Sequence, residues 1–271
     1  MFSTVLIANR GEIAVRIAKT LKKMGIRSVA VYSEADKHSL HVTAADEAVC
    51  IGGSNPSESY LCGDKIIATA LACGAQGIHP AYGFLSENAD FSAAVAAAGL
   101  IFIGPSASAI RAMGGKSQAK ALMQQAGVPL IMGYHGEAQD QETLTKEALK
   151  IGLPVLLKAS AGGGGKGMRE VHHASELPEA IQAAQREGQN SFGDSRLLVE
   201  KLLVKPRHVE VQILADQHGN CVYLFDRDCS LQRRHQKVVE EAPAPHLSAE
   251  LRAAMGQAAV KAAQAIGYSN A

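Results

Sequence analysis

The chain has 271 residues, with 27 Lys and Arg against 26 Asp and Glu, so its formal charge is +1. This balance gives no support to a basic nucleic-acid surface or an acidic tail. Aromatic residues make up only 4% of the chain and there is no Trp, which argues against binding through stacked aromatic platforms. The hydrophobic fraction of 47% is enough for a buried core, and the length favours roughly two domains.

Cysteine usage indicates a reducing compartment, and hydropathy argues against a membrane span. The chain has five Cys, an odd number without metal-ligand spacing, so neither a disulfide framework nor a zinc knuckle is expected. No apolar run reaches the roughly 18 residues of a membrane span, and a strand-like segment at 4–8 leaves no room for a leader peptide. We therefore expect a soluble protein with no membrane or nucleic-acid partner, cytoplasmic in a bacterium or in the mitochondrial matrix if the chain is a processed eukaryotic one.

The first hundred residues alternate between strand and helix patterns. Strands are predicted at 4–8, 28–32, 48–51, 77–80 and 100–103, and helices at 12–24, 60–73 and 87–98. This alternation is typical of βαβ units and a parallel sheet. The run 100–103 is apolar throughout, which predicts a strand buried on both faces. We expect an α/β fold with a Rossmann-like N-terminal domain over 1–113.

The pattern changes after two helices predicted within 107–126. Strands at 155–158, 168–171 and 197–201 with a helix at 176–187 predict a small α+β module over about 128–203. A strictly alternating strand at 208–213, a turn at 216–220, a returning strand at 222–225 and a helix at 249–266 follow. We expect 114–271 to form a second domain with a partial antiparallel sheet. The last helix has no predicted partner for its apolar face, so the chain looks truncated.

Four consecutive glycines in the segment KASAGGGGKGM, residues 158–168, form the strongest local feature. Unhindered backbone N–H groups beside lysines can wrap an anion. Gly162, Gly164 and Gly167 fit G-x-G-x-x-G, but a dinucleotide fold needs a helix where a strand is predicted here. A hairpin lid over phosphates is the favoured interpretation, and a flexible linker is the alternative. Lys116, at a predicted helix start, is a second candidate phosphate ligand or a solvated surface residue.

Residues 226–237 mix cations, carboxylates and amides between two apolar segments. This mixture suits an anionic substrate held in a network of charge pairs, although an exposed charged loop is the alternative. His208 joins the candidates because it lies on the polar face of its predicted strand. His235 joins them because it lies two residues before Lys237.

Two adjacent carboxylates follow this segment, Glu240 and Glu241. Neighbouring residues on a strand point to opposite faces, so at most one of them faces a site. A structural salt bridge from Arg233 or Arg234 to one of them is an equally open interpretation.

Four segments resemble the biotin carboxylase family of ATP-grasp enzymes, and they cover essentially the whole chain in order. They are IANRGEIA at 7–14, HPAYGFLSEN at 79–88, KASAGGGGKGM at 158–168 and RDCSLQRRHQKVVEEAPAP at 227–245. Within the family, GYHGEAQD at 133–140 and KPRH at 205–208 are most similar to the biotin-carrying alpha subunit of methylcrotonyl-CoA carboxylases. Acetyl-, propionyl- and geranyl-CoA carboxylases share most of these motifs.

The resemblance implies that ATP phosphorylates bicarbonate to carboxyphosphate, which then carboxylates biotin, with Mg²⁺ as cofactor. The implied partners are bicarbonate, a biotin carrier domain and a carboxyltransferase (beta) subunit, in an oligomeric full-length enzyme. The residue roles that it implies are phosphate binding by Lys116 and Lys158, lid backbone at Gly164 and Gly165, an adenine hinge of Glu200, Lys201, Leu202 and Leu203, further nucleotide contacts from His208, Gln232 and His235, and bicarbonate binding by Lys237. Main-chain groups of Lys201 and Leu203 would read the adenine edge.

The chain departs from the family pattern in two residues and in length. Ala81 and His246 stand where the family usually has Gly, at positions that favour a residue without side-chain crowding. The family chain continues past position 271 with magnesium-binding Glu residues, a catalytic Arg and the biotin-carrying domain. We therefore expect a chain of these 271 residues to bind ATP weakly and not to turn over. No metal ligand is assigned within it.

Two alternatives stay open, and the second comes from another functional class. Other ATP-grasp ligases, such as carbamoyl-phosphate or purine-pathway enzymes, share the glycine lid but not the segment 227–245. A non-catalytic assembly module that only contacts partner subunits is the second alternative, and a shift of melting temperature with Mg-ATP would argue against it.

Overall fold

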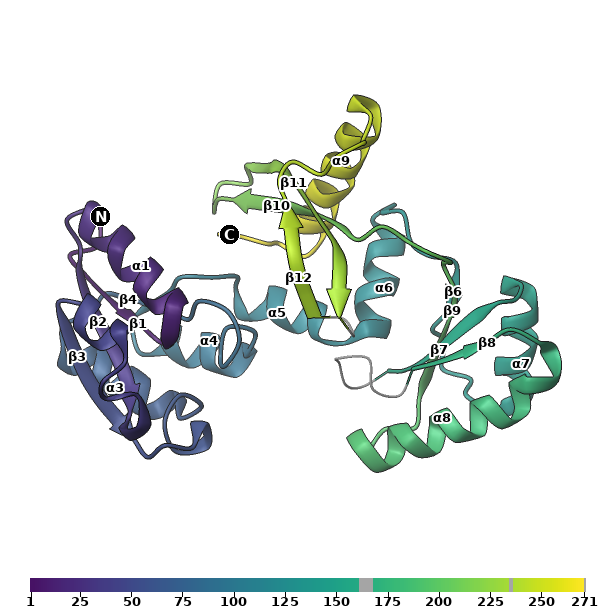
Figure 1. Ribbon diagram of the computed structural model, residues 1–271, viewed down its shortest axis with the longest axis horizontal. Helices are drawn as coiled ribbons and strands as arrows, with labels where there is room; N and C mark the ends of the chain where they lie inside the picture. The colour runs from purple at the N-terminus through teal and green to yellow at the C-terminus, as the bar shows by residue number, and fades with distance from the viewer. Residues whose placement is uncertain (161–167, 234–235, 271) are drawn as a thin grey trace. The chain divides into compact units, whose positions relative to one another are not determined.

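The structure, a computed structural model, describes residues 1–160, 168–233 and 236–270, without the side chain of Lys116. The chain divides into two compact units (Figure 1). The first comprises Met1–Arg111 with the short segment from Tyr268 onward, and the second comprises Ala112–Gly267. Three of the candidate site residues, Gly164, Gly165 and His235, lie outside the described residues.

A parallel sheet forms the centre of the first unit, which confirms the predicted α/β class. Its strands lie in the order β3-β2-β1-β4-β5, and the described neighbours all pair in parallel. The strands are β1 (Thr4–Ile7), β2 (Arg27–Ser33), β3 (Glu47–Gly52), β4 (Gly77–His79) and β5 (Ile101–Phe102). The helices are α1 (Gly11–Lys23), α2 (Leu40–Ala44), α3 (Gly63–Ala72) and α4 (Ala89–Ala97), with 3-10 turns η1 (Glu34–Asp36) and η2 (Pro56–Glu58).

The central strand β1 is buried on both faces. Val5 and Ile7 pack in one hydrophobic cluster with Ile17 of α1. Leu6 packs in a second cluster with Ile66 of α3. Successive side chains of a strand point to opposite faces of the sheet. Helices therefore cover both faces of β1, as expected for a doubly wound parallel sheet.

The prediction that 100–103 is buried on both faces is wrong. β5 has only two residues and lies at the edge of the sheet. Phe102 is buried, but the side chain of Ile101 is 54% exposed. The helix layer need not extend over the outer face of an edge strand, so a continuous apolar run does not require burial on both sides there.

The second unit begins with two helices and a four-stranded sheet. α5 (Ala107–Gly114) crosses the boundary between the units, and α6 (Lys116–Gln125) follows it. The sheet has the order β6-β9-β7-β8 with antiparallel neighbours. Its elements are β6 (Gly133–Tyr134), α7 (Gln141–Ile151), β7 (Val155–Ala159), β8 (Met168–Val171), η3 (Ala174–Glu176), α8 (Leu177–Phe192) and β9 (Leu197–Lys201). The helix predicted at 176–187 is longer, and it ends at Gly193, whose φ of 70° is favourable for glycine.

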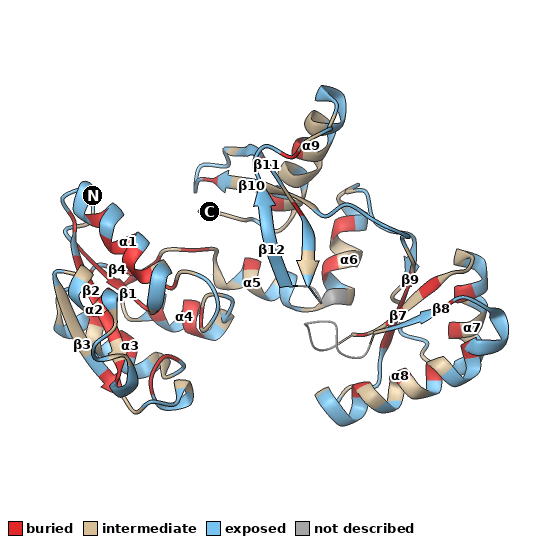
Figure 2. Ribbon diagram, viewed as in Figure 1, coloured by how far each residue is buried: buried red, intermediate tan, exposed pale blue. Residues whose placement is uncertain are grey.

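A second antiparallel sheet, in the order β10-β11-β12, follows (Figure 1). Its strands are β10 (Val209–Ala215), β11 (Cys221–Arg233) and β12 (Gln236–Glu241), and α9 (Ala249–Ala265) packs against β10 and β11. β11 runs through the charged residues that the loop alternative placed outside a strand. The strict alternation predicted for 208–213 is interrupted by a bulge between Val211 and Ile213. β12 is exposed along its length (Figure 2).

Both departures from the family glycines lie in the left-handed backbone region. The φ of Ala81 is 58° and that of His246 is 55°. An L side chain is strained in this region, whereas glycine is not. The two residues therefore occupy positions whose backbone favours the glycine that the family usually has.

Among the described residues, we find no helix with both the length and the apolar character needed to span a bilayer.

Candidate functional site

One buried carboxylate organises the predicted hinge region. Glu200, on β9, is only 4% exposed. It faces Leu156 across the β7–β9 pair, and Lys158 lies two residues further along β7, on the same face. The Nζ atom of Lys158 is 2.5 Å from Glu200 Oε2, and Lys120, on α6, forms an ion pair with Oε1 of the same carboxylate.

The two lysines keep Glu200 ionised in spite of its burial. Burial alone would raise the pKa of the Glu200 carboxyl, but the hydrogen bonds and charges of Lys120 and Lys158 outweigh it and lower this pKa. The three side chains carry a formal charge of +1. An electropositive site therefore lies at the end of β7, immediately before the glycine-rich segment.

The rest of the predicted hinge is held by backbone contacts. The Lys201 ammonium donates to the carbonyls of Gly152 and Leu153, both at 2.8 Å. The Lys201 backbone N–H donates to Met132 O at 2.9 Å, and the Leu202 N–H donates to Pro154 O at 3.1 Å. These groups are engaged within the protein.

Leu203 follows the hydrogen-bonded part of the hinge. Its side chain is 49% exposed. The Lys201 and Leu202 N–H groups already have acceptors, and Leu203 is the next residue of the predicted hinge.

A cavity of about 270 Å³ lies beside this hinge. Its walls are mostly apolar, and Lys120 supplies an ammonium group; the lining is Lys120, Gln124, Val128, Leu130, Ile131, Met132, Gly133 and His135. Gly133 pairs directly with Glu200 in the sheet. The cavity thus places an apolar wall beside the hinge, as expected for a ligand with a flat apolar part, while the Lys120 ammonium is paired with Glu200.

The second group of charged side chains lies on the three-stranded sheet. Arg227 of β11 forms ion pairs with Glu210 of β10 and Glu240 of β12. Lys237 pairs with Glu210, and its Nζ atom is 3.6 Å from Glu240 Oε1. These four residues, two carboxylates and two cations, form a closed ring that we call the charge ring.

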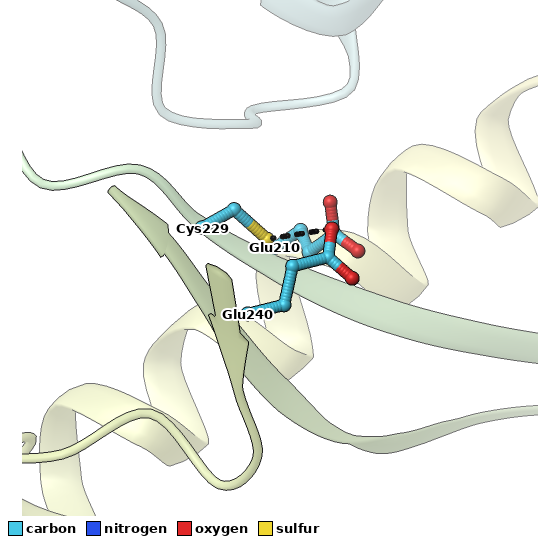
Figure 3. A group of neighbouring side chains, drawn as sticks. All are labelled: Glu210, Cys229 and Glu240. Carbon is cyan, nitrogen blue, oxygen red and sulfur yellow. Dashed lines mark hydrogen bonds between the residues drawn. The ribbon is translucent and has the colours of Figure 1, made fainter. Parts of the chain in front are cut away.

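Cys229 lies against the charge ring (Figure 3). Its buried thiol donates to Glu240 Oε1 over 3.5 Å. Burial and the Glu210 charge raise the pKa of this thiol, so it stays protonated. The hydrogen bond to Glu210 raises the pKa of the Lys237 ammonium. Burial alone would raise the pKa of the Glu210 carboxyl, but its two cationic partners outweigh burial and lower this pKa.

This cluster does not fit Mg²⁺, although ligand atoms of Glu210, Cys229 and Glu240 lie within 4.8 Å of one another. Both carboxylates are already paired with cations, and Mg²⁺ prefers oxygen ligands to a thiol. The ring is therefore suited to hold Lys237 in place rather than to hold a metal.

His208 and Gln232 are brought together on the same sheet. The Gln232 amide nitrogen lies 2.6 Å from His208 Nδ1 and donates to Cys229 O at 2.7 Å. The His208 N–H donates to Ser230 Oγ at 2.9 Å. Gln232 pairs with Lys237 in the β11–β12 register. Gln232 and Lys237 therefore lie on adjoining strands, and His208 immediately precedes β10, so three candidate site residues come together here.

The sequence offers no direct signal for two residues of these groups, Lys120 and Glu210. Arg227 and Glu240 fall in segments that the sequence singles out, but their partners do not follow from it. Glu240 pairs with Arg227 and Lys237, and the described residues show no ion pair from Arg233 to Glu240 or Glu241. Arg234 lies outside the described residues, so a salt bridge from it to either carboxylate stays a prediction. The spacing of Lys120 four residues after Lys116 is a signal that could have revealed it, because such residues share a helix face.

Two of the family motifs meet in the first unit. Asn9, after β1, donates through Nδ2 to Pro80 O at 2.9 Å and Tyr82 O at 2.8 Å. A cavity of about 400 Å³ lies between the motifs, lined by Asn9, Arg10, Gly11, Glu12, Ile13, Tyr82, Gly83 and Phe84. It lies outside the carboxyl ends of β1 and β4, where open α/β sheets usually bind ligands.

The family comparisons cover both units. Residues 1–110 match the family described as biotin carboxylase, N-terminal domain, and residues 115–271 match that described as carbamoyl-phosphate synthase L chain, ATP binding domain. The alpha subunit of mitochondrial methylcrotonoyl-CoA carboxylase from Dictyostelium discoideum is 62% identical over 98% of this chain. The propionyl-CoA carboxylase alpha chain of Ruegeria pomeroyi is 53% identical over 100% of it.

Solved structures with a similar fold come from the same family as these relatives. A biotin carboxylase from Campylobacter jejuni, in a complex described as β-γ-ATP, superposes with a TM-score of 0.93 at 48% identity and covers 99% of this chain. The chain spans 60% of that structure, and 38% and 40% of the Dictyostelium and Ruegeria relatives. The chain belongs to the biotin carboxylase family, with a biotin carboxylase N-terminal domain followed by an ATP-binding domain of the carbamoyl-phosphate synthase L chain type.

Proposed function

We propose that the chain is the biotin carboxylase part of an acyl-CoA carboxylase, most similar to the methylcrotonyl-CoA type. The observation that carries this proposal is the position of Lys158 and buried Glu200 on adjacent strands. There a lysine ammonium stands at the entrance to a glycine-rich segment. The named relatives, at 62% and 53% identity, support the same reaction and differ in the acyl-CoA that their names give.

We assign the site residues as the family resemblance implies. The phosphates of ATP would be bound by Lys116 and Lys158 under the lid backbone of Gly164 and Gly165, its base by the hinge residues Glu200, Lys201, Leu202 and Leu203, and its remaining contacts by His208, Gln232 and His235. Lys237 would bind bicarbonate. The charge ring supports this last role, because it fixes the Lys237 ammonium between two strands.

The chemistry joins two anions before it modifies biotin. A bicarbonate oxygen attacks the γ-phosphorus of ATP, the bond to the β–γ bridging oxygen breaks, and ADP, carboxyphosphate and a proton result. The carboxyl carbon would then bond to the biotin ureido nitrogen as its bond to the phosphate oxygen breaks, and the released phosphate would take the nitrogen's proton. The lysines neutralise charge and fix geometry, and such positioning can lower a barrier by roughly 7–11 kcal/mol.

Magnesium is expected to be bound by residues that the longer relatives carry. Among the described residues, the carboxylates of Glu210 and Glu240 lie close together, but both are paired with cations and do not fit Mg²⁺. By the family resemblance, we expect the magnesium-binding Glu residues in the part of the family sequence that follows position 271 of this chain.

A melting experiment tests nucleotide binding by this chain. Mg-ATP is expected to raise the melting temperature, because a ligand that binds only the folded state stabilises it. Lys158→Met should abolish the shift, and Lys261→Met, which removes an exposed lysine of α9, should keep it. An unchanged melting temperature of the wild type at millimolar Mg-ATP would contradict the proposal.

The full reaction requires a longer chain and its partners. In a chain extended past position 271, ATP hydrolysis should depend on biotin and bicarbonate, which other ATP-grasp ligases would not show. With a carboxyltransferase beta subunit and a biotin carrier domain, the comparison of methylcrotonyl-, propionyl- and acetyl-CoA identifies the acceptor. We expect methylcrotonyl-CoA to be the preferred substrate and the full-length enzyme to be oligomeric.

A further inference from the structure

Glu200 has two cationic partners where a simple buried pair needs one. Its side chain is 6% exposed, and those of Lys120 and Lys158 are 21% and 27% exposed. Lys158 already has a proposed role at the phosphates. Lys120 comes from a different element, α6, and the proposed function leaves it without a role.

The second lysine gives Glu200 a counterion that remains when Lys158 binds a nucleotide. A buried carboxylate that loses its counterion is strongly destabilised. If Lys158 alone paired with Glu200, moving its ammonium to a phosphate would leave such a carboxylate behind. With Lys120 in place, Glu200 keeps one cation while the other is released.

We propose that Lys120 is a positioning residue for nucleotide binding, which holds Glu200 neutralised so that the Lys158 ammonium can transfer to an anionic phosphate. This inference rests on the proposed function, because it takes Lys158 as a phosphate ligand. In the free protein both lysines contact the carboxylate. In the nucleotide complex Lys120 retains Glu200, and Lys158 contacts the phosphates.

A purely structural role predicts different behaviour. Lys120 also ties α6 to the four-stranded sheet, over a sequence separation of 80 residues, so its loss could simply loosen the fold. In that case Lys120→Met would weaken the binding of ATP and the binding of adenosine, which has no phosphate, to the same extent. In the proposed role only ligands with phosphates are affected, and removing the charge of Glu200 removes the need for Lys120.

The test measures affinity for ATP by titration of a fluorescent ATP analogue, and for adenosine by saturation-transfer NMR. Lys120→Met should weaken ATP binding tenfold or more, because truncating one partner of a buried charge pair leaves the other charge unpaired, with adenosine binding unchanged. Lys120→Arg should restore ATP affinity. In a Glu200→Gln background, Lys120→Met should change ATP affinity less than twofold. Lys261→Met serves as the control for loss of one positive charge, and circular dichroism melts confirm that each variant is folded.

The outcomes separate the inference from the function on which it rests. A wild type that binds no ATP refutes the proposed function and the inference with it. Wild-type binding that Lys120→Met leaves unchanged overturns the inference alone. So does an equal loss of ATP and adenosine, or a tenfold loss that persists in the Glu200→Gln background.

Discussion

Replacing Arg227 with Met removes one of the two cations from the charge ring. Arg227 contacts both Glu210 and Glu240, whereas Lys237 pairs with Glu210 and stands 3.6 Å from Glu240. The wild-type ring is neutral, with two carboxylates and two cations. The variant ring carries a charge of −1 and leaves Glu240 with a single, longer contact to a cation.

The expected loss follows from the separation of the two carboxylates, whose ligand atoms lie within 4.8 Å of each other. Two like charges at this distance repel by about 0.9 kcal/mol in water and about 3.5 kcal/mol at an effective dielectric of 20. The ring side chains are 29% to 46% exposed, which places the site nearer the aqueous limit. We expect Arg227→Met to lower the free energy of unfolding at pH 7 by about 1–2 kcal/mol, including the lost exposed ion pairs.

The loss should depend on pH in a defined direction. The ring lowers the pKa of Glu210 below its ordinary value of 4.5, with burial opposing. A carboxyl whose pKa is lower in the folded state stabilises the protein above its unfolded pKa, and this stabilisation disappears as the pH falls through the folded pKa. The difference between wild type and variant should therefore shrink below pH 4.5.

Urea unfolding at pH 7, 5.5 and 4, at low and high salt, measures this difference, and hydrogen exchange of the β10–β12 amides localises it. Arg227→Lys, which keeps a cation at the same position, is the matched control and should lose less than Arg227→Met. A loss that is the same at pH 4 and pH 7, and in high salt, would refute the electrostatic reasoning and indicate lost side-chain packing.

Three further predictions concern backbone strain, pH and a buried ion pair. Ala81→Gly and His246→Gly should each raise the free energy of unfolding by up to about 1 kcal/mol in urea titrations, because left-handed strain of about 1–2 kcal/mol exceeds the entropy that glycine loses; a decrease would contradict this. Burial, with a smaller effect of a nearby arginine, lowers the pKa of His79 from 6.5 to about 4. The free energy of unfolding should therefore fall by about 3 kcal/mol as the pH falls from 6.5 to 4, and His79→Asn should flatten that pH dependence. Asp226→Asn should lower the melting temperature by about 4–8 °C, the shift that a loss of about 2 kcal/mol gives in a unit of this size, since the buried carboxylate accepts from Ala244 N at 2.7 Å and Arg252 Nε at 2.6 Å. An unchanged melt would show that the amide satisfies both donors.

The fold could be predicted wherever local pattern and tertiary environment agree. The strand at 197–201 matches β9 residue for residue, and alternation of strands and helices correctly indicated the parallel sheet. The run 100–103 failed because hydropathy reports that a residue is apolar, not that a neighbour covers it. Ile101, at the edge of the sheet, is apolar and yet exposed.

Strand β11 shows a different limit. Residues 226–228 read Asp-Arg-Asp, a composition that is also common in exposed loops. In the structure Asp226 binds Arg252, Arg227 enters the charge ring and Asp228 binds Arg207. These charges alternate between different partners because a strand places successive side chains on opposite faces. Each is satisfied by a residue distant in sequence, which composition alone cannot reveal.

The same limit explains which part of the candidate site stays hidden in the sequence. Lys158 stands out because glycines follow it, and Glu200 enters through the family resemblance, but neither motif contains Lys120. Its contact with Glu200 joins a helix to a strand across 80 residues of sequence. A motif search ranks residues by their neighbours in the chain, whereas a counterion is chosen by proximity in the fold. Residues that manage the charge of a ligand-binding lysine, rather than bind the ligand, are therefore the ones for which a structure adds most.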